Sequence, residues 1–440
     1  MPVASPVEKG TALVLDSINR FLESPVERRV VATAADGREV DVECDPDGPL
    51  LVHVVRTVVD TFGRASWVRV LRGTLRADSH PVNGRTGHEE RVTQLARPVG
   101  ARTEPATEIA AGDIGILVKL AGTHTGDTLC ERGAVLTLPP IAYPEPMFTA
   151  AIRARGAGDE DRIGGALARL TEEDPSFHVD RDPDTHEVVA RGVGDTHLDV
   201  ALERMKRRFG VEAFLAEPRI AYRETIRGTA RVQHKHKKQS GGAGQYGDCT
   251  LEIEPLPRGE GIVFEDRIVG GVIPQQFRQS VEKGVRQTCE RGALAGHPIV
   301  DVRVRLVDGS THPVDGKDIA FQIAGALAMR EAMHEAQPAL LEPIVAVTVT
   351  VPERLTGDVI GVINGHRGHV GGMNPLGDGR CEVSALVPQA EMYRIPIALR
   401  AATQGRARHR SEPSHYDEAP AAVAQPLIDA WRKEHTAIAS

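Results

Sequence analysis

The chain has 440 residues, more than a single hydrophobic core of roughly 250 to 300 residues can organise, so several domains are expected. A hydrophobic fraction of 41% and a charged fraction of 26% exclude a wholly disordered chain, and a formal net charge of −8 excludes a protein coated in positive charge for nucleic acid. The five cysteines form no CxxC pair and no run approaches the ~20 apolar residues of a membrane span, so we expect a cytoplasmic protein without disulfides or membrane contact.

The first third of the chain predicts a short helix and then strands. Residues 11–22 carry apolar side chains at helical spacing and predict an amphipathic helix that ends before Pro25. Over residues 29–140, short β-branched runs alternate with Gly, Asp and Pro turns, which predicts a β-barrel; only residues 50–62 suggest a helical spacing within it. Four prolines in residues 138–146 predict a domain boundary.

The rest of the chain predicts small α+β domains. Residues 144–219 have the βαββαβ order of a split ferredoxin-like domain, with Asp195 as the N-cap of the second helix. Residues 343–420 repeat that order, with the second helix over residues 391–400. Between them, residues 220–342, which we call the arm domain, combine strands with two helices. One helix carries an apolar stripe at i, i+4 spacing, Phe277, Val281, Val285 and Cys289, and the other is the alanine-rich stretch 318–336. The predicted fold class is therefore multi-domain α+β: a β-barrel followed by two ferredoxin-like domains that flank the arm domain.

The most informative segment is residues 231–247, where a basic run precedes several glycines. Gly242, Gly244 and Gly247 satisfy GxGxxG, but a dinucleotide site needs an apolar strand before the glycines and a helix after them, and here a strand follows at residues 250–255. We favour a hairpin in which glycines let backbone N–H groups approach phosphates while lysines supply charge. From these residues alone, RNA contact and an inert solvated loop are equally open.

Other chemistries lack their motifs in this sequence. No GxxxxGK followed by Ser or Thr occurs and no Asn-Lys-x-Asp, so the chain is not expected to hold GTP. Among seventeen histidines, the pairs His234/His236 and His366/His369 have no third ligand at matching spacing, so surface histidines are expected and no metal. We find no catalytic constellation and predict that this chain is not an enzyme.

The glycine-rich segment resembles the fourth-domain loop of elongation factor G, which is His-Lys-Lys-Gln-Ser-Gly-Gly-x-Gly-Gln-Tyr-Gly. Residues 111–129 resemble the family's second domain, residues 192–210 its third, and residues 356–361 its fifth. Pro313 stands where the family usually has an acidic residue, Asp195 and Thr196 replace its usual Glu-Leu, and a loop at Gly365 and His366 is less basic than usual. The resemblance implies this layout: residues 1–28 as the end of the GTPase domain, 29–140 as the second domain, 144–219 as the third, 220–342 as the fourth, similar to ribosomal protein S5, 343–420 as the fifth, and 421–440 as a C-terminal helix or tail.

The resemblance also implies a function. The complete family member is a ribosome-binding translational GTPase that couples GTP hydrolysis to translocation or ribosome recycling; GTP and Mg²⁺ belong to its GTPase domain, and no cofactor is expected in this chain. We expect the chain to be a monomeric piece of such a protein rather than a factor that naturally lacks the GTPase. The implied contacts with rRNA, tRNA and mRNA in the decoding region come from His236, Lys237, Lys238, Gln239, Ser240, Gly241, Gly242, Gly244, Gln245, Tyr246, Gly247, Ser310 and His312.

Two alternatives remain open at this point. Within translation, a ribosomal protection factor of the tetracycline-resistance kind shares the layout but usually departs from the Ser-Gly-Gly-x-Gly-Gln-Tyr-Gly sequence. From a different class, an enzyme could use Gly242, Gly244 and Gly247 as a nucleotide-cofactor loop; tight nucleotide binding would distinguish it.

Overall fold

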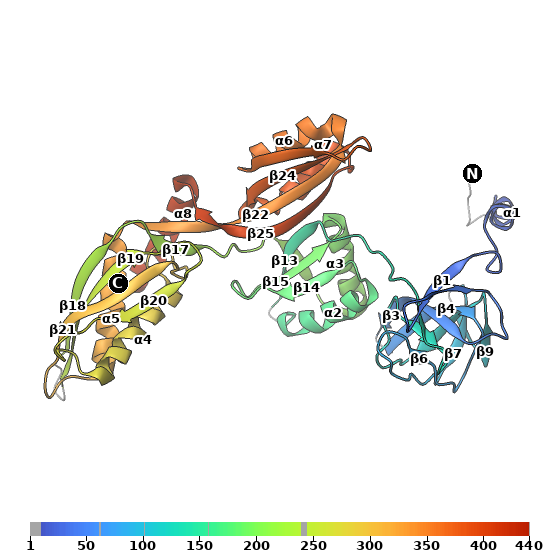
Figure 1. The fold of residues 1–440 in the computed structure, drawn as a ribbon, viewed down its shortest axis with the longest axis horizontal. Coiled ribbons are helices and arrows are strands. Elements are labelled where there is room, and N and C mark those ends of the chain that lie inside the picture. Colours follow the sequence, from blue (N-terminus) through green and yellow to red (C-terminus); the bar gives the residue numbers. More distant parts are fainter. Residues whose placement is uncertain (1–9, 61–62, 101, 157, 239–243, 440) are drawn as a thin grey trace. The chain divides into compact units, whose positions relative to one another are not determined.

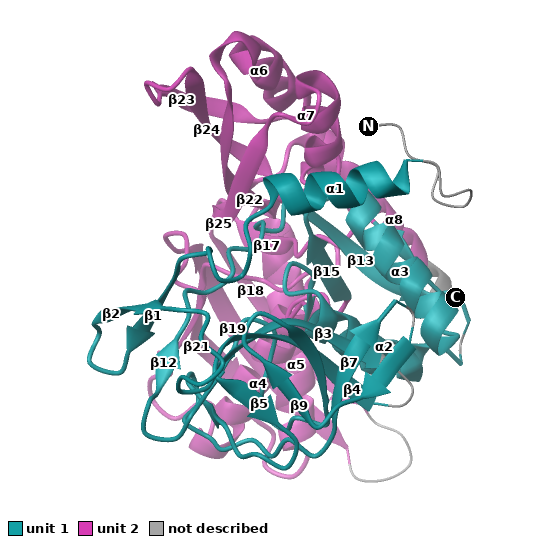
Figure 2. Cartoon of the chain, turned by 90° about the vertical axis from the view of Figure 1, so that its right-hand side faces the viewer, with its two compact units in different colours: residues 1–181, 188–216 teal, residues 182–187, 217–440 magenta. Residues whose placement is uncertain are grey.

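A computed structural model describes residues 10–60, 63–100, 102–156, 158–238 and 244–439. The chain divides into two compact units (Figure 2). One unit holds residues 1–181 and 188–216, and the other holds residues 182–187 and 217–440. Among the described residues, no helix is long and apolar enough to cross a membrane.

The first unit begins with the predicted helix, α1 (Thr11–Phe21), which buries none of its residues. An all-β region follows (Figure 1), built as a seven-stranded sheet in the order β6-β11-β3-β4-β10-β7-β8, a three-stranded sheet β12-β1-β2 and a two-stranded sheet β5-β9. The strands are β1 (Val30–Ala34), β2 (Glu39–Val42), β3 (Leu51–Asp60), β4 (Gly63–Arg72), β5 (Thr74–Arg76), β6 (Val82–Asn83), β7 (Leu95–Val99), β8 (Arg102–Pro105), β9 (Glu108–Ala110), β10 (Ile114–Val118), β11 (Thr128–Cys130) and β12 (Leu136–Thr137).

The helical spacing suggested for residues 50–62 is wrong, because β3 is a strand paired with β4 and β11. A β-bulge between Val54 and Arg56 adds one residue to the strand and moves its buried face from even to odd positions. Val54 and Thr57 are therefore both fully buried although three residues apart. That spacing imitates the turn of a helix.

The first ferredoxin-like domain has the predicted βαββαβ order. Its sheet order, β14-β15-β13-β16, places the first and third strands at the centre. The elements are β13 (Phe148–Ala154), α2 (Glu160–Glu173), β14 (His178–Arg181), β15 (Val188–Gly192), α3 (Asp195–Phe209) and β16 (Ala213–Ala216). The predicted N-cap is wrong by one residue: Gly194, in an extended conformation, is the N-cap, and Asp195 is the first helical residue. An acidic side chain there still interacts favourably with the helix dipole.

In the second unit, the arm domain packs two helices on one four-stranded sheet (Figure 1). The sheet order is β18-β19-β21-β20, and only the β20–β21 pair is parallel. The elements are β17 (Arg223–Ile226), β18 (Ala230–Lys238), β19 (Gln245–Pro255), β20 (Ile262–Asp266), α4 (Gln275–Arg291), β21 (Val302–Ser310) and α5 (Asp318–Glu335). The predicted apolar stripe of α4 is buried, and its Phe277 stacks on Phe321 of α5 with ring centroids 4.7 Å apart.

The second ferredoxin-like domain follows on a long shared strand, β22 (Pro338–Pro352), which also pairs with β17 of the arm domain. The elements are η2 (Glu353–Leu355), α6 (Thr356–Gly365), β23 (His369–Pro375), β24 (Arg380–Pro388), η3 (Gln389–Glu391), α7 (Ile395–Thr403), β25 (Arg408–Glu418) and the terminal helix α8 (Ala421–Ala439). The helix expected from residue 391 begins only at Ile395, because Pro396 is tolerated in a first helical turn but not further inside a helix.

Candidate nucleic-acid interface

The predicted hairpin exists, and its strands end at the glycine-rich loop. β18 and β19 pair antiparallel from Ala230 to Lys238, with Lys238 opposite Gln245 and Lys237 opposite Tyr246. Four of the predicted contact residues, Gln239, Ser240, Gly241 and Gly242, lie outside the described residues. Gly247 is needed for packing, since a Cβ there would lie 2.5 Å from the backbone carbon of Ala320 in α5.

A second loop, residues 311–317, lies against this hairpin, and we call the two together the arm tip. The backbone N–H of Tyr246 donates to the Asp315 carbonyl oxygen at 2.8 Å, and the Tyr246 hydroxyl lies 2.7 Å from Ser310 Oγ. The ring centroids of Tyr246 and His312 are 6.0 Å apart. The structure therefore brings Tyr246 together with Ser310 and His312, which lie more than sixty positions further along the chain.

The His312 ring is oriented by its own loop. Its Nδ1 accepts the backbone N–H of Asp315 at 3.1 Å and that of Val314 at 3.4 Å. A nitrogen that accepts hydrogen bonds carries no proton, so the neutral ring has its N–H on Nε2. With 49% of its side chain exposed, His312 can donate from Nε2 to a phosphate or hydroxyl oxygen of a partner.

Two lysines at the end of β18 lack ion-pair partners among the described residues, whereas arginines further along the same sheet are paired. Residues 231–238 contain four cations and no carboxylate. Lys237 and Lys238 are exposed, and in the described part of the chain neither has an ion-pair partner. By contrast, Arg303 and Arg305 of β21 both contact Glu254, at 2.6 and 2.7 Å.

Three predicted residues lie on the opposite face of the sheet. Side chains alternate along a strand, so Lys237 and its cross-strand neighbour Tyr246 share one face. His236, Lys238 and Gln245 lie on the other, which faces α5, although Lys238 is exposed at the end of its strand. His236 Nε2 and Gln245 Oε1 are 3.4 Å apart. Gly244 lies below the Asp315 carboxylate, where a Cβ would approach that group to 2.7 Å.

Sequence reasoning missed Asp248 and Gln233. Asp248 is only 4% exposed, and its carboxylate accepts hydrogen bonds from Ser310 Oγ at 2.6 Å and from Gln233 Nε2 at 3.0 Å. The only feature of the sequence that points to Asp248 is its position directly after Gly247. The sequence does not show on which face of the sheet the side chain of a single strand residue lies.

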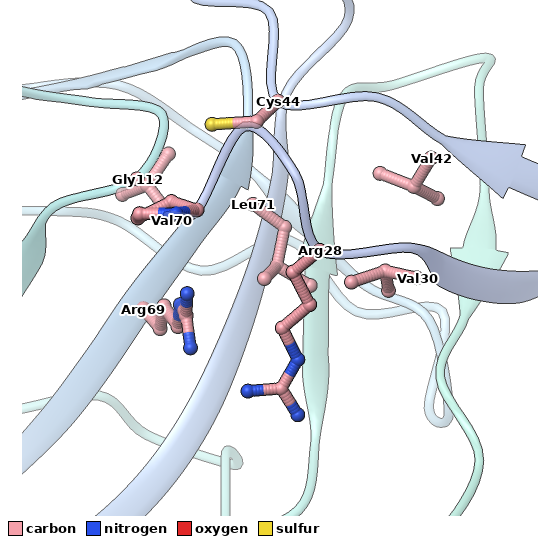
Figure 3. A pocket seen from close by; sticks show the side chains of 9 residues that line it. Arg28, Val30, Val42, Cys44, Arg69, Val70, Leu71 and Gly112 are labelled. Atoms are coloured by element: carbon pink, nitrogen blue, oxygen red, sulfur yellow. The ribbon is translucent and has the colours of Figure 1, made fainter. Parts of the chain in front are cut away.

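A small pocket lies in the other unit, between the segment after α1 and the all-β region (Figure 3). Apolar side chains and the guanidinium-bearing Arg28 and Arg69 line it, together with Cys44. The enclosed space is only about 10 Å³, no more than one water molecule needs, so this pocket is too small for a ligand. No group of three metal-ligating side chains occurs among the residues that the structure describes.

In chain order, the fold is thus an all-β region, a ferredoxin-like domain, an α+β domain with basic residues at its tip, and a second ferredoxin-like domain. Comparisons with known proteins identify the family. Residues 52–132 match elongation factor G domain 2, residues 143–217 match domain III, residues 218–337 match domain IV, and residues 339–427 match the elongation factor G C-terminus. The chain belongs to the elongation factor G family.

Two relatives illustrate how far the similarity extends. An elongation factor G-like protein of Thermotoga maritima is 42% identical over 427 residues, which is 97% of this chain and 62% of the relative. A crystal structure of a protein from Thermus thermophilus matches with a TM-score of 0.74 and 35% identity, covering 98% of this chain and 62% of that one. The chain thus spans about three fifths of the length of these relatives.

Proposed function

We propose that this chain is the ribosome-binding part of an elongation factor G-like translation factor, and that its arm tip contacts RNA in the decoding region. The observation that carries the proposal is the exposed Lys237, directly across the hairpin from Tyr246, together with the Nε2–H donor of His312 beside that ring. The exposed Lys238 adds a second cation at the end of the same strand. Cations bind phosphates, and an aromatic ring and a neutral donor suit bases and ribose oxygens. In the complete protein, GTP hydrolysis with Mg²⁺ on a GTPase domain would drive tRNA movement or ribosome recycling.

Ribosome binding by this chain is expected to weaken strongly with salt. If three lysines of β18 (Lys235, Lys237 and Lys238) each release one counterion, affinity should fall roughly 20- to 40-fold between about 50 and about 200 mM salt. Lys238→Ala should lower the salt slope by roughly 0.7 to 0.9, whereas Lys283→Ala, an exposed lysine on α4, should leave it unchanged. Co-sedimentation with ribosomes across a salt series measures the affinity and its salt slope for each protein. A salt slope that is the same in Lys238→Ala, Lys283→Ala and the wild type would contradict the proposed interface.

His312 is expected to act in tRNA movement rather than in binding. Joined to a family GTPase domain, the His312→Ala chain should bind ribosomes and hydrolyse GTP normally but move tRNA more slowly. Alanine also removes the Nδ1 acceptor, at a stability cost of about 1 kcal/mol. His312→Asn is the matched control, because its side-chain oxygen can accept the same backbone N–H groups while the Nε2–H donor is lost. Full-speed movement by the Asn variant, and by a variant with both His312 and Lys238 replaced by Ala, would rule out this role.

The chain by itself is expected neither to bind GTP measurably nor to hydrolyse it. The sequence contains no P-loop lysine motif and no Asn-Lys-x-Asp, which such binding requires. Titration calorimetry with GTP and Mg²⁺ tests this directly. Micromolar affinity would show that another part of the chain binds nucleotide, and it would revive the cofactor-loop alternative.

A further inference from the structure

The carboxylate of Asp248 lies directly beneath the arm tip and has an unusual set of partners. It is 4% exposed, and the hydrogen bonds to it come from the neutral groups Ser310 Oγ and Gln233 Nε2. A buried carboxylate is unfavourable unless hydrogen bonds compensate for its lost hydration. Its presence under an otherwise exposed surface therefore calls for a structural or functional reason.

The carboxylate determines the direction of a chain of hydrogen bonds. A carboxylate only accepts hydrogen bonds, and the Ser310 hydroxyl donates to Asp248 Oδ2 at 2.6 Å. Ser310 Oγ, 2.7 Å from the Tyr246 hydroxyl, must then accept, and Tyr246 donates inward. Outside this chain of hydrogen bonds, the Lys235 ammonium group lies 5.0 Å from the centroid of the Tyr246 ring. The pKa of Lys235 is raised above its ordinary value, chiefly by its interaction with the Tyr246 side chain and also by the Asp248 charge.

We propose that Asp248 is a positioning residue for the RNA-contacting tip. Acting through Ser310, it holds the Tyr246 hydroxyl inward and so keeps the Tyr246 ring beside the ring of His312 and under the Lys235 ammonium group, which lies 5.0 Å from the ring centroid. A chain of hydrogen bonds that all point toward one charge is stronger than its isolated members. This inference rests on the proposed function, because the positioning matters only if the tip meets RNA.

The positioning itself can be tested without the ribosome. The chain has five tyrosines, so ¹⁹F NMR of the 3-fluorotyrosine-labelled protein gives a resolvable spectrum, and Tyr246→Phe assigns the Tyr246 signal. Asp248→Asn and Ser310→Ala should each shift that signal and broaden it. Asp308→Asn, which makes the same charge change at an exposed site on β21, should not. Should Asp248→Asn fail to fold, Ser310→Ala still interrupts the chain of hydrogen bonds. A Tyr246 signal unmoved in the folded Asp248 or Ser310 variant would overturn the positioning role.

The consequence for RNA contact is tested by a double-mutant cycle in ribosome binding at low salt. Asp248→Asn and Tyr246→Phe should each weaken binding roughly three- to tenfold, and the double variant should be no weaker than the worse single one, because both remove the same chain of hydrogen bonds. Losses that multiply would show that Asp248 acts independently of Tyr246. If instead the ¹⁹F signal moves while binding is insensitive to these variants and to Lys238→Ala alike, the proposed RNA contact fails and the positioning chain is structural only.

Discussion

Alanine in place of Glu224 is expected to destabilise the arm domain by about 4 kcal/mol, since it leaves several buried backbone donors without an acceptor. Glu224 lies on β17 and is fully buried. One carboxylate oxygen accepts the N–H groups of Ala293 and Leu294 at 2.6 and 2.8 Å, and the other accepts those of Ala295 and His297 at 2.8 and 3.0 Å. A single side chain thus holds the whole loop that follows α4.

Hydrogen exchange of peptides that cover residues 293–299 measures this effect locally. Exchange there should accelerate by roughly three orders of magnitude in Glu224→Ala, and by less in Glu224→Gln, which keeps one acceptor. Glu290→Ala, at an exposed position near the end of α4, is the control and should stay within about 0.5 kcal/mol of the wild type. If residues 293–299 were as protected from hydrogen exchange in Glu224→Ala as in the control, water would accept these hydrogen bonds in place of the carboxylate without a loss of stability.

A methyl group at Gly284 is expected to separate the two helices of the arm domain and destabilise it by about 3 kcal/mol. A Cβ there would lie 2.0 Å from the Gln322 carbonyl oxygen of α5, far inside van der Waals contact. Gly325 of α5 is similarly close to α4, since a Cβ at that position would lie only 2.6 Å from the Val281 carbonyl oxygen. Because both contacts involve helix backbone, no side-chain rotation can relieve them.

Replacing glycine by alanine normally stabilises a helix. A loss of stability in Gly284→Ala would therefore show that the close contact between α4 and α5 outweighs this gain. Gly361→Ala in α6 has no atom within 4 Å of the new methyl group and should gain roughly 0.5 to 1 kcal/mol from helix propensity. Urea unfolding followed by circular dichroism, with hydrogen exchange to locate the loss, compares the two variants. Stabilisation by Gly284→Ala would show that α4 and α5 pack less closely than described.

Local pattern predicted most of the elements correctly. The stripe containing Phe277 and Val281 is buried as its spacing indicated, and both predicted βαββαβ stretches are present in the structure. The errors have local causes: a bulge in β3 altered its spacing, and the helix predicted from residue 391 is delayed to Ile395 by Pro396. The domain boundaries at residues 144, 220 and 343 stay predictions.

The candidate site was less predictable than the fold. Lys237, Lys238, Tyr246 and His312 stand out in the sequence by charge, glycine context and family resemblance, and whether they contact RNA stays a prediction. His236 shares that context, yet strand alternation turns it toward α5. No sequence motif marks Asp248 as buried, because the sequence alone does not distinguish a buried aspartate from an exposed one.

The amino-acid sequence by itself determined the family, the order of domains and the type of most elements, because hydrophobic periodicity and turn residues act over a few positions and many matching stretches occur in one order. Tertiary structure alone decided that residues 311–317 lie against the hairpin, that Ser310 links Tyr246 to Asp248, and that Glu224 accepts four backbone N–H groups. These contacts join residues about sixty to seventy positions apart, and their free energy comes from burial and hydrogen bonding that exist only once the sheet and helices have packed.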